Sequence, residues 1–322
     1  MGKTVKSKIA FIFPGQGSQA PGMGLELFNT FPEAKKIFEK ADQLFGSNLS
    51  EICFSGSSEY LQKTEIAQPA MLTVSSAICE ILELKGITPD YLAGHSLGEY
   101  SALVCSGVLT FEAAFKLVKL RGELMAKAGE ISPGTMVAII GANKRELEKE
   151  CMGFSSDNSV VIANYNGPQQ LVISGTLEAI ERFSELMLEK GKKVIPLNVS
   201  GAFHSHLMKP ALEELVEAIE NTEFSDARIP IVTNVDSSIT RDGKRFKEKL
   251  KWQLISPVLW EDCVNCMISQ RVTTFVEVGP LRVLSKMVKR IDKSRIAFSV
   301  EDVKSLENFI SYNNELITAE AH

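Results

Sequence analysis

The chain has 322 residues, of which 44% are hydrophobic and 23% charged, so it can bury one large core or two smaller ones. Its formal net charge of −5 excludes a globally basic surface, and we therefore expect no nucleic acid as a partner. The apolar run at residues 9–14 is too short for a signal-peptide core, and no later window reaches the ~18 uncharged apolar residues of a membrane span. We expect a cytoplasmic protein without membrane contact.

The cysteines indicate packing and not metal binding. Cys263 and Cys266 form a C-x-x-C pair, but no second cysteine or histidine pair completes a zinc site. Their three-residue spacing is typical of the inner face of an amphipathic helix. We expect reduced thiols, core packing and no metal.

The first part of the chain predicts alternating strands and helices. Residues 8–13 form a short apolar run that ends at a Pro-Gly pair, which is typical of a buried strand. Helical spacing follows over 33–45, and Pro32 suits the first turn of that helix. The next predicted elements are a mostly buried helix at 68–84, a strand at 90–95, and helices at 97–107 and 111–128.

The middle of the chain predicts a smaller unit of β-α-β-β-α-β order, which is the ferredoxin-like arrangement. Its two central strands are joined by the turn signal Asn166-Gly167-Pro168. The expected strands are 135–141, 160–165, 171–174 and 193–197, and the expected helices are 144–151 and 177–189.

The α/β pattern then resumes. We expect helices at 209–221, 258–270 and 281–291, and strands at 231–234, 274–278 and 295–299. The simplest fold is a discontinuous large α/β-hydrolase-like domain with a parallel sheet, residues 1–131 and 200–322. A small ferredoxin-like α+β domain, residues 132–199, is inserted in it.

A candidate nucleophile lies between a predicted strand and a predicted helix. Residues 94–98, Gly-His-Ser-Leu-Gly, fit G-x-S-x-G, whose glycines allow a sharp turn that projects the Ser96 hydroxyl above the sheet. The helix N-terminus offers unpaired N–H groups to an oxyanion, and we expect Leu97 N–H to be the first donor. Alternatively, Ser96 caps the helix, since Glu99 three residues later completes a capping box. We expect Glu99 to take part in capping the helix and Ser96 to be the nucleophile.

A serine nucleophile needs a base, and histidine has the suitable pKa. His322 is terminal, and His95 is next to Ser96 in the chain, so its side chain points away from that of Ser96 in a sharp turn. His204 and His206 remain, and the residues alone do not choose between them. No Asp or Glu is indicated as the acid that orients the base.

The segment 15–20, Gly-Gln-Gly-Ser-Gln-Ala, matches the dinucleotide-binding pattern G-x-G-x-x-G/A. Pro21 and Gly22 follow directly, so no helix opens there to hold a pyrophosphate. We reject a nicotinamide or flavin cofactor on this ground.

Six motifs together resemble the malonyl-CoA:acyl carrier protein transacylases of fatty acid synthesis and the acyltransferase domains of polyketide synthases. In chain order they are FPGQGSQ (13–19), GHSLGEY (94–100), KLRGELM with Arg121, ANYNGPQQLVISG (163–175), AFHSHLMKP (202–210) and WQLISPVLW with Gln253. The resemblance covers residues 9 to about 290.

The resemblance implies a role for each matching residue. Ser96 is the acylated nucleophile, and the LMKP that follows selects His204 as the base, oriented by the main-chain carbonyl of Gln253. Gln16 joins Leu97 N–H at the oxyanion site. Arg121 holds the malonyl carboxylate, a task that suits the bidentate, always-charged guanidinium. The further expected substrate contacts are Met125, Asn164 and His95.

The implied activity is malonyl transfer from malonyl-CoA to acyl carrier protein by a monomer that uses no cofactor besides the coenzyme A thioester substrate. The AFH signature at 202–204 indicates malonyl choice. The alternatives are a polyketide-type acyltransferase with another acyl choice, a serine thioesterase or other hydrolase, and a non-catalytic acyl-binding subunit.

Overall fold

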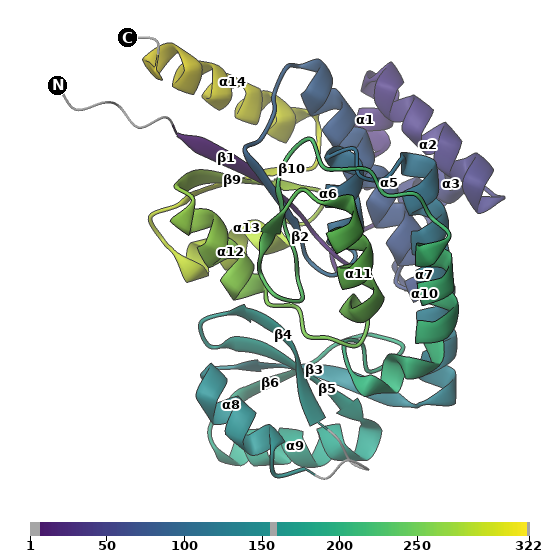
Figure 1. The fold of residues 1–322 in the computed structure, drawn as a ribbon, viewed down its shortest axis with the longest axis vertical. Helices are drawn as coiled ribbons and strands as arrows, with labels where there is room; N and C mark the ends of the chain where they lie inside the picture. Colours follow the sequence, from purple (N-terminus) through teal and green to yellow (C-terminus); the bar gives the residue numbers. More distant parts are fainter. Residues whose placement is uncertain (1–6, 155–159, 321–322) are drawn as a thin grey trace.

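The computed structural model describes residues 7–154 and 160–320. A six-stranded sheet in the order β10-β9-β1-β2-β7-β8 forms the centre of its larger part (Figure 1). All neighbouring strands are parallel except the pair β7–β8. The strands are β1 (Lys8–Phe13), β2 (Tyr91–Gly94), β7 (Ile231–Val232), β8 (Ile239–Thr240), β9 (Val272–Val278) and β10 (Ile296–Val300).

Both faces of this sheet are buried, as the apolar run of β1 predicts. Phe11 and Phe13 belong to one core cluster, whereas Ala10 and Ile12 belong to another. Successive side chains of a strand point to opposite faces, so the two clusters lie on the two sides of the sheet.

Helices cover the two faces of the sheet. Nearly every side chain of α5 is buried, as its apolar sequence predicts. The helices of this part are α1 (Leu25–Thr30), α2 (Pro32–Phe45), α3 (Leu49–Ser55), α4 (Ser58–Leu61), α5 (Thr64–Leu84), α6 (Gly98–Cys105), α7 (Phe111–Ile131), α10 (Leu212–Glu220), α11 (Gly243–Gln253), α12 (Trp260–Ser269), α13 (Val283–Ile291) and α14 (Val303–Glu320). No helix within residues 7–154 and 160–320 is long and apolar enough to cross a membrane.

A smaller, four-stranded antiparallel sheet lies at one end of the molecule, with α8 and α9 on its outer face (Figure 1). Its order β4-β5-β3-β6 is that of the predicted ferredoxin-like unit. Its elements are β3 (Gly134–Ile140), α8 (Lys144–Cys151), β4 (Val160–Gly167), β5 (Gln170–Thr176), α9 (Leu177–Glu189) and β6 (Lys193–Pro196). We propose that it is the inserted domain, residues 132–199.

Backbone hydrogen bonds join the two parts. Tyr165 N donates to Val258 O, and Val258 N donates to Ala163 O, both over 2.9 Å. The edge strand β4 is thereby paired with the segment before α12, which fixes the position of the smaller sheet relative to the larger one.

The elements α1, α3, α4, β8 and α14 were not expected from the sequence, and two further regions differ from the expectation. The predicted helix at 209–221 begins as a 3-10 helix, His206–Ala211, because Pro210 lacks the N–H that a continuous α-helix needs, and α10 follows it. Helix α11 is absent from the expectation because its sequence, GKRFKEKLKWQ, is rich in lysine and shows few apolar residues. Asp242, whose side chain accepts from Lys244 N and Arg245 N, is the N-cap signal that marks its start.

Candidate active site

Ser96 lies on a sharp turn between β2 and α6, with a left-handed φ of 52°. A Cβ on Gly94 would lie 1.9 Å from the carbonyl carbon of Gly98, and a Cβ on Gly98 would lie 2.1 Å from Phe13 O. Both positions therefore require glycine. The left-handed conformation costs a serine about 1–2 kcal/mol, so surrounding contacts must hold it.

The structure brings His204, and not His206, to this serine. His204 Nε2 lies 2.7 Å from Ser96 Oγ, whereas His206 is exposed at the start of the 3-10 helix. His95 Nε2 pairs with Asn166 Oδ1 at 2.8 Å. His322 lies outside the described residues.

Two main-chain carbonyls orient the base. His204 Nδ1 lies 3.0 Å from Gln253 O and 3.0 Å from Ser256 O. Carbonyl oxygens only accept hydrogen bonds, so Nδ1 carries the proton and the lone pair of Nε2 faces the serine hydroxyl. The dyad is thus arranged for Ser96 to give its proton to His204. Ser256 was not among the expected residues, because nothing local distinguishes a carbonyl that orients a side chain.

The base is neutral at pH 7. Burial, followed by the positive charge of Arg121, lowers the pKa of His204 from 6.5 to about 3. Burial also lowers the pKa of His95. A neutral imidazole can accept the serine proton.

Glu99 does not form the expected capping box. Leu97 is the N-cap of α6 and makes no side-chain capping bond, while Ser96 Oγ faces His204. The Glu99 carboxylate is 2% exposed and accepts hydrogen bonds from Gln253 Nε2 and Asn234 N. The local pattern is overridden because tertiary partners reach this carboxylate. Burial raises the pKa of Glu99 to about 7, and its hydrogen bonds with Gln253 and Asn234 act in the opposite direction.

Arg121, on α7, is a buried cation beside the dyad. It is 1% exposed and donates from Nη1 to Gln68 Oε1 at 2.7 Å and from Nη2 to Ser96 Oγ at 3.2 Å. Among the described residues it has no ion-pair partner, and its Nε is buried without a hydrogen-bond partner. Burying a cation without a direct ion-pair partner costs several kcal/mol, so the site favours a bound anion. Gln68 was expected only as part of a buried helix.

Of the expected oxyanion donors, Leu97 follows Ser96 in the chain and Gln16 lines the same cavity as Ser96. The first N–H groups of α6, from Gly98 to Tyr100, each bond a carbonyl three residues earlier, but the described backbone hydrogen bonds include none from Leu97 N. Gln16, in the loop after β1, donates from Nε2 to Thr64 Oγ1 at 3.0 Å, and its buried Oε1 has no described partner.

A cavity of about 340 Å³ lies between the two parts of the molecule. Its walls include every expected site residue except Gln253, which lies behind His204. The small unit contributes Met136 and Pro196 to the opposite wall. The expected residues that line it are Gln16, His95, Ser96, Leu97, Arg121, Met125, Asn164 and His204.

No group of three or more His, Cys, Asp or Glu side chains in the described part of the chain could hold a metal ion. Cys263 is buried in the core beneath the large sheet, and Cys266 packs against the same cluster. Their expected role in packing is confirmed.

Comparison with known proteins decides the family. Residues 10–313 match the acyl transferase domain. The chain belongs to this family. The Malonyl CoA-acyl carrier protein transacylase of Bacillus subtilis is 46% identical over 303 residues, which cover 94% of this chain and 96% of that protein.

Solved structures agree in fold. An acyl carrier protein S-malonyltransferase from Vibrio cholerae is 42% identical with a TM-score of 0.91, covering 94% of this chain and all of that one. A malonyl-transacylase in complex with its type II PKS acyl-carrier protein is 39% identical with a TM-score of 0.92. The match covers 95% of this chain and 100% of that one. The expected α/β fold with a small antiparallel unit and the family resemblance are confirmed.

Proposed function

We propose that this protein transfers a malonyl group from malonyl-CoA to the phosphopantetheine thiol of acyl carrier protein, through a malonyl ester of Ser96, in fatty acid biosynthesis. The observation that carries the proposal is Arg121, a buried guanidinium without an ion-pair partner among the described residues, 3.2 Å from the hydroxyl of a serine–histidine dyad. The names of the relatives support the same activity.

In the first half-reaction, His204 Nε2 takes the proton of Ser96 as Oγ attacks the thioester carbonyl. The oxyanion that forms is held by Leu97 N–H and by Gln16 in the loop after β1. When the carbon–sulfur bond breaks, His204 returns the proton to the departing thiolate of coenzyme A. The malonyl group is then an ester of Ser96.

In the second half-reaction the carrier protein's thiol gives its proton to His204 and its sulfur attacks the ester carbonyl. Its unperturbed pKa of about 8.5 resembles that of the coenzyme A thiol, so one base serves both steps. The carbon–oxygen bond breaks, and Ser96 takes the proton back. Because the two thiols enter in turn, the same cavity serves donor and acceptor.

Arg121 selects the acyl group. A malonyl ester on Ser96 extends a free carboxylate, and the guanidinium can hold it with two parallel hydrogen bonds. Gln68, which accepts from Nη1, fixes the plane of the guanidinium. Met125, Asn164 and His95 would contact the rest of the substrate. Both substrates are soluble molecules, and we propose that the protein acts on them as a cytoplasmic monomer.

Intact-protein mass after brief exposure to malonyl-CoA tests the proposal. We expect the mass of one malonyl group to appear on the protein and to be absent in Ser96→Ala. Less labelling is expected with acetyl-CoA and methylmalonyl-CoA. With carrier protein present, rapid formation of free malonate without malonyl carrier protein would show a hydrolase instead.

A further inference from the structure

We infer that Glu99 is a positioning residue that couples the placement of the nucleophile to the placement of the base. Its buried carboxylate joins Asn234, which holds the backbone of Ser96, to Gln253, which orients His204. The inference rests on the proposed function, which identifies the reaction. It adds Glu99 as a residue that acts through Asn234 and Gln253.

The peptide groups on both sides of Ser96 are held by side chains from distant segments. Asn234 Oδ1 accepts from Ser96 N at 2.7 Å, and Asn234 Nδ2 donates to Gly94 O at 2.6 Å. Gln253 Nε2 donates to Ser96 O at 3.0 Å. These three bonds oppose the tendency of a left-handed serine to relax.

The base depends on one of the same residues. Gln253 O accepts from His204 Nδ1, while Gln253 Nε2 donates to Glu99 Oε2 at 2.7 Å. Asn234 N donates to the same Glu99 oxygen at 3.3 Å. A single carboxylate oxygen thus connects the residue that holds the nucleophile with the residue that orients the base.

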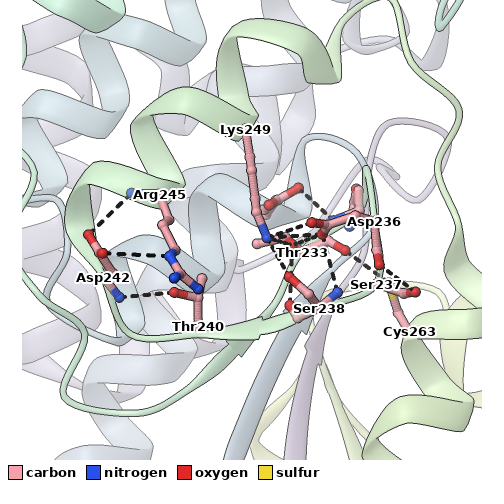
Figure 2. A network of polar contacts seen from close by, with 11 residues as sticks. Thr233, Asp236, Ser237, Ser238, Thr240, Asp242, Arg245, Lys249 and Cys263 are labelled. Atoms are coloured by element: carbon pink, nitrogen blue, oxygen red, sulfur yellow. Dashed lines mark hydrogen bonds and ion pairs between the residues drawn. The ribbon is translucent and has the colours of Figure 1, made fainter.

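A second network connects the same two segments. Figure 2 shows Lys249 pointing from α11 into the turn that follows β7. Its ammonium group bonds Thr233 Oγ1 at 3.0 Å and Asp236 Oδ1 at 2.9 Å. Asn234 belongs to this turn and Gln253 ends α11, so Lys249 and Glu99 together fix the turn against the helix.

A carboxylate is a costly side chain at this place. Glu99 is 2% exposed, and it is not among the residues that line the cavity, so it does not meet the substrate. An apolar side chain would fill the space without the desolvation cost but could accept no hydrogen bond from Gln253 or Asn234. The bonds it accepts therefore explain why a side-chain oxygen acceptor stands here.

The test compares three variants by the rate at which a fluorophosphonate probe labels Ser96, a reaction that needs the dyad but no malonyl group. Glu99→Ala removes the shared acceptor, and a misplaced dyad should react roughly 100-fold more slowly. Glu99→Asp keeps the carboxyl group but ends one methylene short of Gln253, and should lose at least about tenfold because the dyad is again misplaced. Glu99→Gln can still place one oxygen at the Oε2 position and should stay close to the wild-type rate.

Glu277→Gln is the matched control. This acid is also fully buried, but it accepts the backbone N–H groups of Val283, Leu284 and Ser285 at the start of α13. The control should label at the wild-type rate, even if its melting temperature falls. With malonyl-CoA, Glu99→Ala and Glu99→Asp should lower kcat with little change in KM.

Labelling of folded Glu99→Ala or Glu99→Asp at the wild-type rate would overturn the inference, and so would an equal loss in Glu277→Gln. If Glu99→Ala does not fold, the labelling rate of Glu99→Asp tests the inference. If the wild-type protein reacts with the probe but gains no malonyl group from malonyl-CoA, the proposed function is wrong. The comparison of labelling rates would still test the role of Glu99.

Discussion

At the scale of single residues, the chemistry of the site depends on where one positive charge is buried. Arg121 touches Ser96 Oγ, and its charge adds to the effect of burial in lowering the pKa of His204, so the same guanidinium can select the acyl group and weaken the base of the free enzyme. A malonyl carboxylate bound to Arg121 would offset that charge. Binding of the preferred acyl group would then make His204 a stronger base.

Arg121→Ala should therefore distinguish acyl groups. Loss of a buried, charge-assisted contact costs about 2–5 kcal/mol, so we expect kcat/KM for malonyl-CoA to fall by roughly 30-fold or more. Activity with acetyl-CoA, which has no free carboxylate, should change far less. Equal losses with both thioesters would contradict the role of Arg121 as carboxylate ligand.

His204→Ala should abolish most activity, because it removes the group 2.7 Å from the nucleophile. A general base contributes typically about 10²–10⁴-fold, and the loss should fall in that range. His206→Ala is the neighbouring control and should retain most of the wild-type rate of malonyl transfer. The reverse order of effects would show that His206 is the base.

The pH dependence follows from the lowered pKa of His204. A base whose pKa is about 3 remains neutral as the pH falls through 6.5, so kcat/KM for malonyl-CoA should keep its value from pH 7 down to about pH 5. A decline centred near 6.5 would contradict a buried base beside Arg121. In Arg121→Ala the fall of kcat/KM for acetyl-CoA at acid pH should occur at a higher pH than in the wild type, since removal of a positive charge raises the pKa of His204.

At the scale of elements, the turn between β2 and α6 is determined by its own sequence. Gly94→Ala would place a Cβ 1.9 Å from the carbonyl carbon of Gly98, which only a shift of backbone could relieve. We expect a loss of roughly 3 kcal/mol of stability in chemical denaturation, together with loss of activity.

Gly153→Ala offers a control for this glycine substitution. Its Cβ would meet only Glu150 O, at 3.2 Å, on the exposed end of α8. The expected change is within about 0.5 kcal/mol. Similar losses in both variants would show that the close contact at Gly94 is not the cause.

Helix α11 shows why one element of the site was not predicted. Only Phe246 and Leu250 of its hydrophobic side chains are fully buried, so the apolar pattern is weak. Yet α11 ends at Gln253, which donates to Ser96 O, and carries Lys249, which holds the turn after β7. A helix that is held mainly by polar contacts shows little hydrophobic periodicity in its sequence.

At the scale of the whole molecule, the cavity exists because the small unit is fixed against the large one through β4 and Val258. Part of its wall comes from each unit, so the acyl-enzyme is covered on two sides. Such enclosure limits the access of water to the ester, as transfer to a thiol requires.

The surface supports the proposed monomer. Several of the exposed large apolar side chains stand at the ends of different helices, such as Leu84 on α5, Ile131 on α7 and Leu177 on α9. Single exposed apolar side chains do not require a partner subunit. Sedimentation velocity should give the mass of one chain at micromolar concentration, and a concentration-dependent dimer would contradict this.

The sequence by itself determined the nucleophile turn, the ferredoxin-like order of helices and strands along the chain, and the family. These features are encoded locally, since glycine spacing, hydrophobic period and motif order can be recognised without knowing how distant segments pack. The residues alone narrowed the base to His204 and His206, and the resemblance then favoured His204.

Only the tertiary structure placed His204 against Ser96, 108 residues away in the chain, and Gln253 against Glu99, 154 residues away. It also changed Glu99 from an expected helix cap into a buried carboxylate and added the carbonyl of Ser256 to the site. Such contacts arise when packed helices and sheets bring polar groups together away from water. Each buried group must then find a partner, and which partner it finds depends on the packing and not on the neighbouring sequence.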